Sequence, residues 1–284
     1  DHPSRDSLFA DDGIDLQGKR AKAITQNLPF LLDWAQADGL MVPTHYQARG
    51  LPPKIRRDAW VVHDGVDTDF FSPGGDGVLD FLPNPIPADA PVVTYATRGM
   101  EPHRGFPQFM QAISALQKTH LDVHVIIAGR DRVYYGRDDL PDGQTWKTKM
   151  LADYEYDRAR LHFTGPLPYG QYRDVLRRSH AHVYLTVPFV LSWSLIEAMA
   201  TACPIITNDC PPTKEALPDE SSAQFVNFLD VRSVLDGITH MLDHPTQAHA
   251  KGAAARDIAL HQYTQSDIFP QKYAYIRSIA TAPL

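Results

Sequence analysis

Arg98 and Arg104 are the residues of this chain whose type and spacing point most directly to chemistry. They lie in the Gly-containing segment T-R-G-M-E-P-H-R-G-F, which follows an apolar run and leads into a helical pattern. Guanidinium groups donate charge-assisted hydrogen bonds to phosphate oxygens, so two of them on one loop could bind a diphosphate and stabilise it as a leaving group. The alternative is that both arginines pair with surface carboxylates such as Glu101.

A second group of candidate residues follows the apolar run H-V-Y-L, in the segment T-V-P-F-V-L-S-W-S-L-I-E-A-M-A. Ser192 and Ser194 bracket Trp193 at the expected start of a helix. The amides from Leu191 to Ser194 would have no partner within that helix and would suit a diphosphate or sugar hydroxyls. Glu197 could accept hydrogen bonds from both hydroxyls of a ribose. Alternatively, Glu197 only stabilises the first turn of its own helix.

The elements that must position these residues alternate along the chain. Apolar runs typical of buried strands occupy residues 92–96, 123–128, 161–164, 181–186 and 204–207. Helical patterns occupy residues 108–117, 146–157, 169–178, 191–201 and 211–217, and further ones at 231–242, 245–261 and 268–279 end the chain. This alternation predicts an α/β fold with a doubly wound parallel sheet, whose strand ends would bring the candidate loops to one edge.

The N-terminal sequence follows a different pattern. Residues 19–37 read as an amphipathic helix, and M-V-P-T-H-Y-Q reads as a short strand running into a helix that Thr44 would cap. A further strand, W-V-V, precedes D-G-V-D-T-D-F-F-S-P-G-G. The Pro- and Gly-rich run 74–91 is expected to be a loop.

Composition excludes several classes of protein. With 284 residues, 43% of them hydrophobic, the chain can bury a sizeable core. A formal net charge of -7 argues against a nucleic-acid partner. No apolar run approaches the roughly 18 to 20 residues needed to span a bilayer, and the N-terminus lacks a signal peptide's apolar core. We therefore expect a cytoplasmic protein without a transmembrane segment, and peripheral membrane contact stays open. Cys203 and Cys210 lack metal-ligand spacing, and no metal is expected.

Several of these segments resemble the retaining glycosyltransferases of family 4 (group 1), which have the twin-Rossmann (GT-B) fold. In that family a Glu, seven residues, Glu pattern precedes an Ala-Met-Ala helix and a small-Pro-hydrophobic-hydrophobic strand. Here the second Glu is Glu197 and the strand is C-P-I-I. The first Glu, which contacts the transferred sugar in the family, falls on Phe189. The arginine segment resembles the family's G-R-L-x-x-x-K-G phosphate clamp, with Arg98 at its Arg, Arg104 at its Lys and one residue more between them.

Other elements of the family pattern are also present. D-G-V-D-T-D-F-F-S-P is similar to the family's N-G-V-D-x-x-x-F-x-P linker, with Asp64 where Asn is usual, and L-H-F-T-G-P-L is similar to its nucleobase-receiving V-x-F-x-G-x-V element. Glu215 matches a family Glu, but without the adjacent glycines we interpret it as a helix-start or core-buttressing carboxylate. The expected donor-binding residues are Gly99, Gly129, Thr164, Gly165, Leu167, Phe189, Leu191, Ser192, Trp193 and Ser194, beside the catalytic Arg98, Arg104 and Glu197. At Gly129 the glycine is equally explained by strand geometry.

The resemblance implies a metal-independent retaining glycosyltransferase. Its donor would be a nucleoside diphosphate sugar, bound as substrate with no cofactor, and its acceptor an unidentified glycan, lipid-linked molecule or protein. The implied organisation is the end of an N-terminal acceptor domain (1–62), a linker and loop (63–90), a Rossmann-like donor domain (91–262) and a C-terminal helix that crosses back (263–284). We expect the chain to be part of a longer protein. Phe189 and the missing acceptor half leave one alternative open, a non-catalytic nucleotide-sugar binding module. A twin-Rossmann epimerase or phosphorylase is a further alternative.

Overall fold

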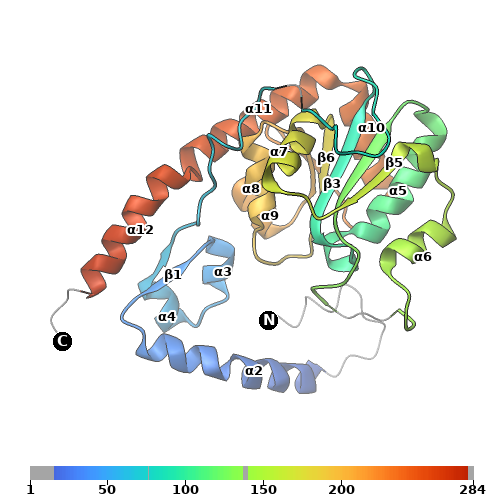
Figure 1. Cartoon of the computed structure of the whole chain (residues 1–284). Coiled ribbons are helices and arrows are strands. Elements are labelled where there is room, and N and C mark those ends of the chain that lie inside the picture. The colour runs from blue at the N-terminus through green and yellow to red at the C-terminus, as the bar shows by residue number, and fades with distance from the viewer. Residues whose placement is uncertain (1–15, 76, 137–139, 281–284) are drawn as a thin grey trace.

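A six-stranded parallel sheet forms the centre of the structure, a computed structural model that describes residues 16–75, 77–136 and 140–280 (Figure 1). The strand order is β5-β4-β3-β6-β7-β8. The strands are β3 (Val92–Gly99), β4 (His124–Arg130), β5 (Leu161–Gly165), β6 (Ala181–Tyr184), β7 (Ile205–Asn208) and β8 (Gln224–Val226). Because the chain builds outward from β3 in one direction and from β6 in the other, the sheet is doubly wound. The predicted α/β class is confirmed, with β8 as a strand that the pattern did not predict.

Helices cover both faces of this sheet. They are α5 (Phe106–Thr119), α6 (Trp146–Asp153), α7 (Tyr169–Arg178), α8 (Trp193–Ala200), α9 (Pro211–Ala216), α10 (Val231–Asp243) and α11 (Pro245–Gln262). Successive strand residues point to opposite faces: Val93 packs in the core beneath α5 and α10, whereas Val92 packs on the other face against Leu82 of the Pro-rich loop. Helices α8 and α11 meet through Leu195 and Ala255 in a second core cluster. No helix in the described residues is long and apolar enough to cross a membrane.

The N-terminal part, residues 16–61, forms a small separate layer. It comprises α2 (Leu16–Gln36), β1 (Leu40–Val42), α3 (His45–Arg49), α4 (Pro53–Asp58) and β2 (Ala59–Val61), and β1 pairs with β2 in parallel. Thr44 caps α3 as predicted, because its side chain accepts a hydrogen bond from the Gln47 amide at 3.1 Å. Val42, Ala48 and Leu51 form the buried core of this layer.

Contacts from both ends of the main unit connect it to the N-terminal part. The final helix, α12 (Gln265–Ala280), leaves the sheet and runs beside the N-terminal layer, where the rings of Tyr275 and Trp60 lie 4.9 Å apart (Figure 1). On α9, the carboxylate of Glu215 accepts hydrogen bonds from the amides of His45 and Tyr46 at 2.6 and 2.8 Å. Glu215 therefore caps α3 across the contact between the two parts. The expected role as a helix-start or core-buttressing carboxylate is wrong, because Glu215 lies near the end of α9, is half-buried and binds the amides of a different helix.

Candidate functional site

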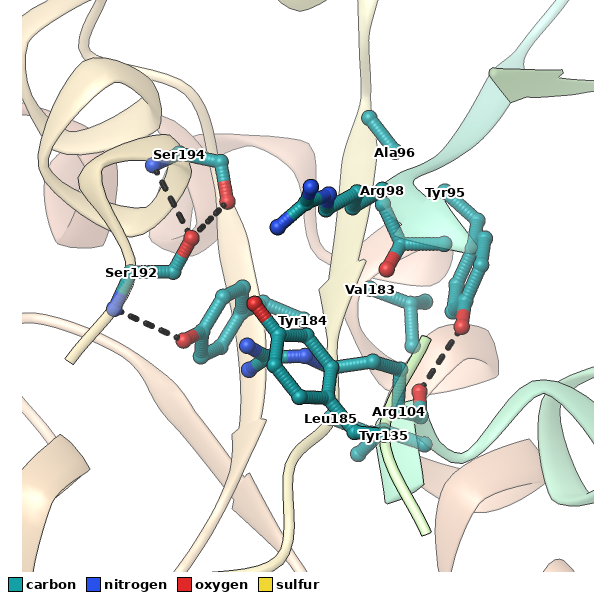
Figure 2. Close-up of a pocket in the computed structure, with 11 residues that line it drawn as sticks. Tyr95, Ala96, Arg98, Arg104, Tyr135, Val183, Tyr184, Leu185, Ser192 and Ser194 are labelled. Carbon is teal, nitrogen blue, oxygen red and sulfur yellow. Dashed lines mark hydrogen bonds between the residues drawn. The ribbon is translucent and has the colours of Figure 1, made fainter. Parts of the chain in front are cut away.

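A pocket of about 120 Å³ lies at the carboxyl ends of β3 and β6, the two neighbouring strands from which the sheet is extended in opposite directions (Figure 2). It is lined by Tyr95, Ala96, Thr97, Arg98, Arg104, Tyr135, Val183, Tyr184, Leu185, Ser192 and Ser194. Open α/β sheets bind ligands at this switch point, because the loops after the two strands diverge and leave a crevice. The position of the pocket follows from the strand order alone.

Arg98 and Arg104 reach this pocket from different backbone positions. Arg98 lies in the last residues of β3 and is exposed, whereas Arg104 ends the short helix η1 (Pro102–Arg104) and is half-buried. The guanidinium of Arg104 donates a hydrogen bond to the Thr186 hydroxyl at 2.8 Å. Among the described residues, neither guanidinium forms an ion pair with a carboxylate. Two cations without a counter-ion in one pocket are suited to an anionic ligand.

Glu101, the surface carboxylate considered as a partner for these arginines, is fully buried instead. One of its oxygens accepts hydrogen bonds from the amides of Tyr134 and Tyr135, the latter at 2.9 Å. Burial raises the pKa of the Glu101 carboxyl, and the two amide hydrogen bonds oppose that rise. The interpretation of Glu101 as a surface ion-pair partner is therefore wrong: this carboxylate holds a neighbouring loop.

The start of α8 faces the arginines across the pocket. The Ser192 hydroxyl caps the helix by accepting a hydrogen bond from the Ser194 amide at 3.3 Å, and the two serine hydroxyls are 2.8 Å apart. The Tyr184 hydroxyl accepts a hydrogen bond from the Ser192 amide at 3.3 Å. Figure 2 shows the guanidinium of Arg98 pointing across the pocket toward Ser192 and Ser194. A guanidinium, two hydroxyls and the positive end of a helix dipole therefore converge on one space.

Glu197 belongs to an adjacent cavity of about 570 Å³ rather than to the arginine pocket. That cavity is lined by Asp64, Gly65, Val66, Asp67, Phe70, Phe71, Tyr169, Trp193, Glu197, Gln265 and Phe269. Glu197 is only 7% exposed, and burial raises its pKa to about 7 against an opposing hydrogen bond from Tyr172. Trp193 lines this cavity whereas Ser192 and Ser194 line the first, so the start of α8 separates the two.

Phe189 packs on Arg104, close to the arginine pocket. Its ring centroid lies 6.0 Å from the Arg104 guanidinium carbon and 5.2 Å from the Tyr135 ring. The position at which the sequence resemblance implies a sugar-contacting Glu is thus filled by a half-buried aromatic group that contacts a cation. Leu191, two residues further along the chain, is buried in the core against α8.

Close packing explains two of the predicted glycines, and a positive φ explains the third. A Cβ on Gly99 would lie 2.5 Å from the Arg132 carbonyl oxygen, and Gly129, with φ +137°, would collide with the carbonyl oxygen of Thr97. Gly165, with φ +69°, faces open space at the end of β5.

The remaining predicted residues lie near the end of β5. Thr164 donates to the carbonyl of Gly165 at 2.9 Å, and Leu167 packs beside Val175 and Ile126. Neither these residues nor Gly165 line the two cavities described above.

Sequence reasoning missed several aromatic residues of the site. Tyr95 donates a hydrogen bond from its hydroxyl to the Arg104 carbonyl at 2.8 Å, and Tyr184 supports Ser192. Both lie in apolar strands, where the sequence alone does not distinguish an aromatic residue of a site from one that packs in the core. Tyr134 and Tyr135 lie in the loop after β4. Two consecutive tyrosines after a predicted strand are the one feature of the sequence that could have marked these residues. His103, in the arginine segment, is buried with its ring against Gly136.

Solved structures with this fold include glycosyltransferases. Sucrose-phosphate synthase from Thermosynechococcus elongatus matches with a TM-score of 0.72 and 17% identity over 89% of this chain and 62% of that one. Anabaena HepE, in complex with UDP-glucose, matches with a TM-score of 0.69 and 13% identity over 85% of this chain and 64% of that one. This chain thus spans less than two thirds of their length. The C-terminal domain of a group 1 glycosyl transferase, LpcC from Francisella tularensis, matches at 0.57 and 17% identity over 70% of this chain and 98% of the domain.

Family models agree with the structural comparison. A model described as glycosyl transferases group 1 matches residues 80–258, which include the whole six-stranded sheet, and one described as glycosyl transferase family 4 group matches residues 4–71. A comparison with curated protein sequences gives no match. Since the first model covers more than half of the chain and the fold matches the C-terminal domain of GT-B enzymes, this protein belongs to the group 1 (family 4) glycosyltransferases.

Proposed function

We propose that this chain is the donor-binding part of a retaining glycosyltransferase that moves a sugar from a nucleoside diphosphate sugar to an acceptor. The observation that carries the proposal is the pocket at the switch point, where two arginines face the serine-capped start of α8 and form no ion pair with any carboxylate in the described part of the chain. The likeness to HepE, whose structure contains UDP-glucose, supports a nucleotide-sugar donor. On this proposal, residues 16–61 belong to an acceptor domain and α12 crosses back to it.

On this proposal, each group of site residues would bind a different part of the donor. Arg98 and Arg104 would bind the diphosphate and neutralise the charge that grows on it as the bond to the sugar breaks, so that no metal ion is needed for that role. The hydroxyls and amides at the start of α8 would hold phosphate and sugar oxygens. Glu197, as a carboxylate, would accept hydrogen bonds from the ribose diol. Catalysis would then arise from positioning and charge stabilisation.

Phe189 supports a second candidate, a nucleotide-sugar binding module that does not transfer the sugar. An aromatic ring accepts no conventional hydrogen bond from a sugar hydroxyl, so the sugar would be held by Ser192, Ser194 and backbone groups. We expect transfer to survive, with weak discrimination between donors. Turnover of the full-length protein against a donor panel, beside Phe189→Glu, separates the two. An inert wild type together with a Phe189→Glu variant that transfers or hydrolyses the donor would favour the binding module.

Calorimetry with uridine, guanosine and adenosine diphosphates tests the proposed function itself. We expect one of them to bind in the micromolar to millimolar range. Arg98→Ala and Arg104→Ala should each weaken that binding about tenfold or more, because a lost charge-assisted contact is worth at least ~1.4 kcal/mol. Affinity for the matching nucleoside should barely change. No heat with any diphosphate, or equal losses for nucleoside and diphosphate, would contradict the assignment.

A further inference from the structure

We propose that Tyr134, Tyr135 and Phe189 form an aromatic support that positions the guanidinium groups of Arg98 and Arg104 in the pocket, and that Glu101 fixes the two tyrosines in place. The inference rests on the proposed function, because it assigns these residues as positioning residues for the diphosphate site. It extends that function to a loop, residues 131–136, that the resemblance does not address.

The first step is the attachment of this loop to the end of β3. Glu101, fully buried in the arginine segment, accepts hydrogen bonds from the amides of Tyr134 and Tyr135. A Cβ on Gly99 would lie 2.7 Å from Cδ2 of Tyr134, so the ring lies directly on the β3 backbone. Further along, Gly136 with φ +84° leaves no room for a Cβ beside the ring of His103. The loop is therefore fastened to the arginine segment at both tyrosines and beyond them.

The second step is the contact between rings and cations. The guanidinium carbon of Arg98 lies 4.4 Å from the Tyr134 ring centroid, and that of Arg104 lies 5.3 Å from the Tyr135 centroid. Phe189 approaches Arg104 from a different loop at 6.0 Å, and its ring meets that of Tyr135 at 5.2 Å with an interplanar angle of 57°. Each clamp arginine thus rests on at least one ring, and Arg104 contacts two.

Aromatic rings differ from carboxylates in the way that they hold an arginine. A ring attracts the cation through its quadrupole and carries no net charge, so the guanidinium keeps its full charge for a phosphate. A carboxylate would neutralise that charge and compete with the ligand. Fixing a long, flexible side chain before the ligand arrives also lowers the entropy lost on binding. A phenylalanine at position 189 therefore suits a residue that positions Arg104.

The decisive experiment compares ring removal with ring retention. Tyr135→Leu and Phe189→Leu should weaken binding of the nucleoside diphosphate that the wild type prefers by about three- to tenfold, the range expected for a cation–ring contact. Tyr135→Phe and Phe189→Tyr should stay within about twofold, and affinity for the matching nucleoside should not change. In an Arg104→Gln background, Phe189→Leu should have no further effect. Tyr273→Leu, which removes a ring that is exposed on α12, is the matched control.

Leucine variants that bind the diphosphate like the wild type, or that lose nucleoside affinity equally, would overturn the inference and leave the proposed function intact. Wild-type protein that binds no nucleotide would instead overturn the proposed function. The inference is then still testable in the free protein by a double-mutant cycle of Arg104→Gln with Phe189→Leu, read as unfolding midpoints. Additive effects in that cycle would show that ring and cation do not interact.

The role of Glu101 has its own pair of variants. Glu101→Gln keeps a carbonyl oxygen that can accept from both amides, whereas Glu101→Ala removes the acceptor. We expect Glu101→Ala to speed amide hydrogen exchange in residues 131–136 and to weaken diphosphate binding about threefold or more, and Glu101→Gln to do neither. A Glu101→Gln variant that loses as much as Glu101→Ala would show that the charge of Glu101 matters rather than its hold on the loop. A Glu101→Ala variant that behaves like the wild type would show that Glu101 does not fix the loop.

Discussion

Glu197 is a buried carboxyl group whose effect on the stability of the protein depends on pH. Its pKa is raised to about 7 by burial, against a reference value of 4.5 that also describes the unfolded chain. For an acid with a raised folded-state pKa, folding favours the protonated form, so its contribution to stability falls as the pH rises from about 4.5 to about 7. Above pH 7 the ionised carboxylate destabilises the fold by roughly 3 kcal/mol, at 1.36 kcal/mol for each pKa unit.

Replacing this carboxylate should therefore stabilise the free protein. We expect Glu197→Gln to raise the free energy of unfolding by about 1 to 3 kcal/mol at pH 8, and by less at pH 5, where the native carboxyl is already protonated. Urea unfolding at both pH values measures the difference. Glu155→Gln, at an exposed position, should change neither value. A destabilising Glu197→Gln at pH 8 would show that the carboxylate is needed for packing.

The same substitution should weaken ligand binding selectively. A neutral amide offers one acceptor oxygen where a carboxylate accepts from both ribose hydroxyls, so Glu197→Gln should reduce affinity for a ribonucleotide far more than for its 2′,3′-dideoxy analogue. For the wild type, ribonucleotide affinity should fall as the pH drops below about 7, because the carboxylate becomes protonated. Calorimetry between pH 6 and 8 with both ligands measures this, and parallel losses for the two would return Glu197 to a purely structural role.

At the scale of elements, local pattern predicted most of the sheet and its helices. The predicted helix 169–178 coincides with α7, and the predicted strand 92–96 lies within β3. Hydrophobic periodicity predicts these elements correctly because the residues on their buried faces recur at regular intervals within the segment itself. It missed β8, which has three residues of which only Val226 is fully buried, too few to show a period.

The candidate site was predictable only in part, for a related physical reason. Arg98, Arg104 and the serines of α8 are legible because each follows a strand, and parallel strand ends share an edge. The roles of Glu101 and Tyr135 depend on β3 and β4 being neighbours, which brings residues from different loops together. No pattern within either segment carries that information.

The close contact between β3 and β4 at this edge leads to a prediction about Gly129. Gly129→Ala places a Cβ against the Thr97 carbonyl at a positive φ, and we expect it to lower the free energy of unfolding by about 2 kcal/mol or more. Gly170→Ala, in α7 with open space around it, should stay within about 1 kcal/mol of wild type. Denaturant unfolding of both variants provides the test. Equal stabilities would show that β3 and β4 can separate at this point without cost.

At the scale of the whole molecule, Glu215 fastens the N-terminal part to the main unit by accepting hydrogen bonds from the amides of His45 and Tyr46. We expect Glu215→Ala to speed amide exchange at residues 45 and 46 at least about fivefold, since the amides lose acceptors worth about 1 kcal/mol. Exchange within the six-stranded sheet should not change. Glu220→Ala, at an exposed position beyond α9, is the control. Faster exchange throughout the sheet would mean that the two parts unfold as one.

Asp64 joins three segments that are distant in the sequence. Its carboxylate accepts hydrogen bonds from Lys272 of α12 at 2.5 Å and from the Trp193 indole at the start of α8 at 3.2 Å. Burial alone would raise the pKa of Asp64, but these two donors and the charge of Lys272 lower it, so the group stays ionised. Lys272 lies in the middle of α12, roughly 12 Å along the axis from its last residue, so a swing of about 10° around this joint would move that end of the helix by roughly 2 Å. Because Asp64 and Trp193 both line the cavity that contains Glu197, a change in the angle of α12 would move the Trp193 ring at that cavity.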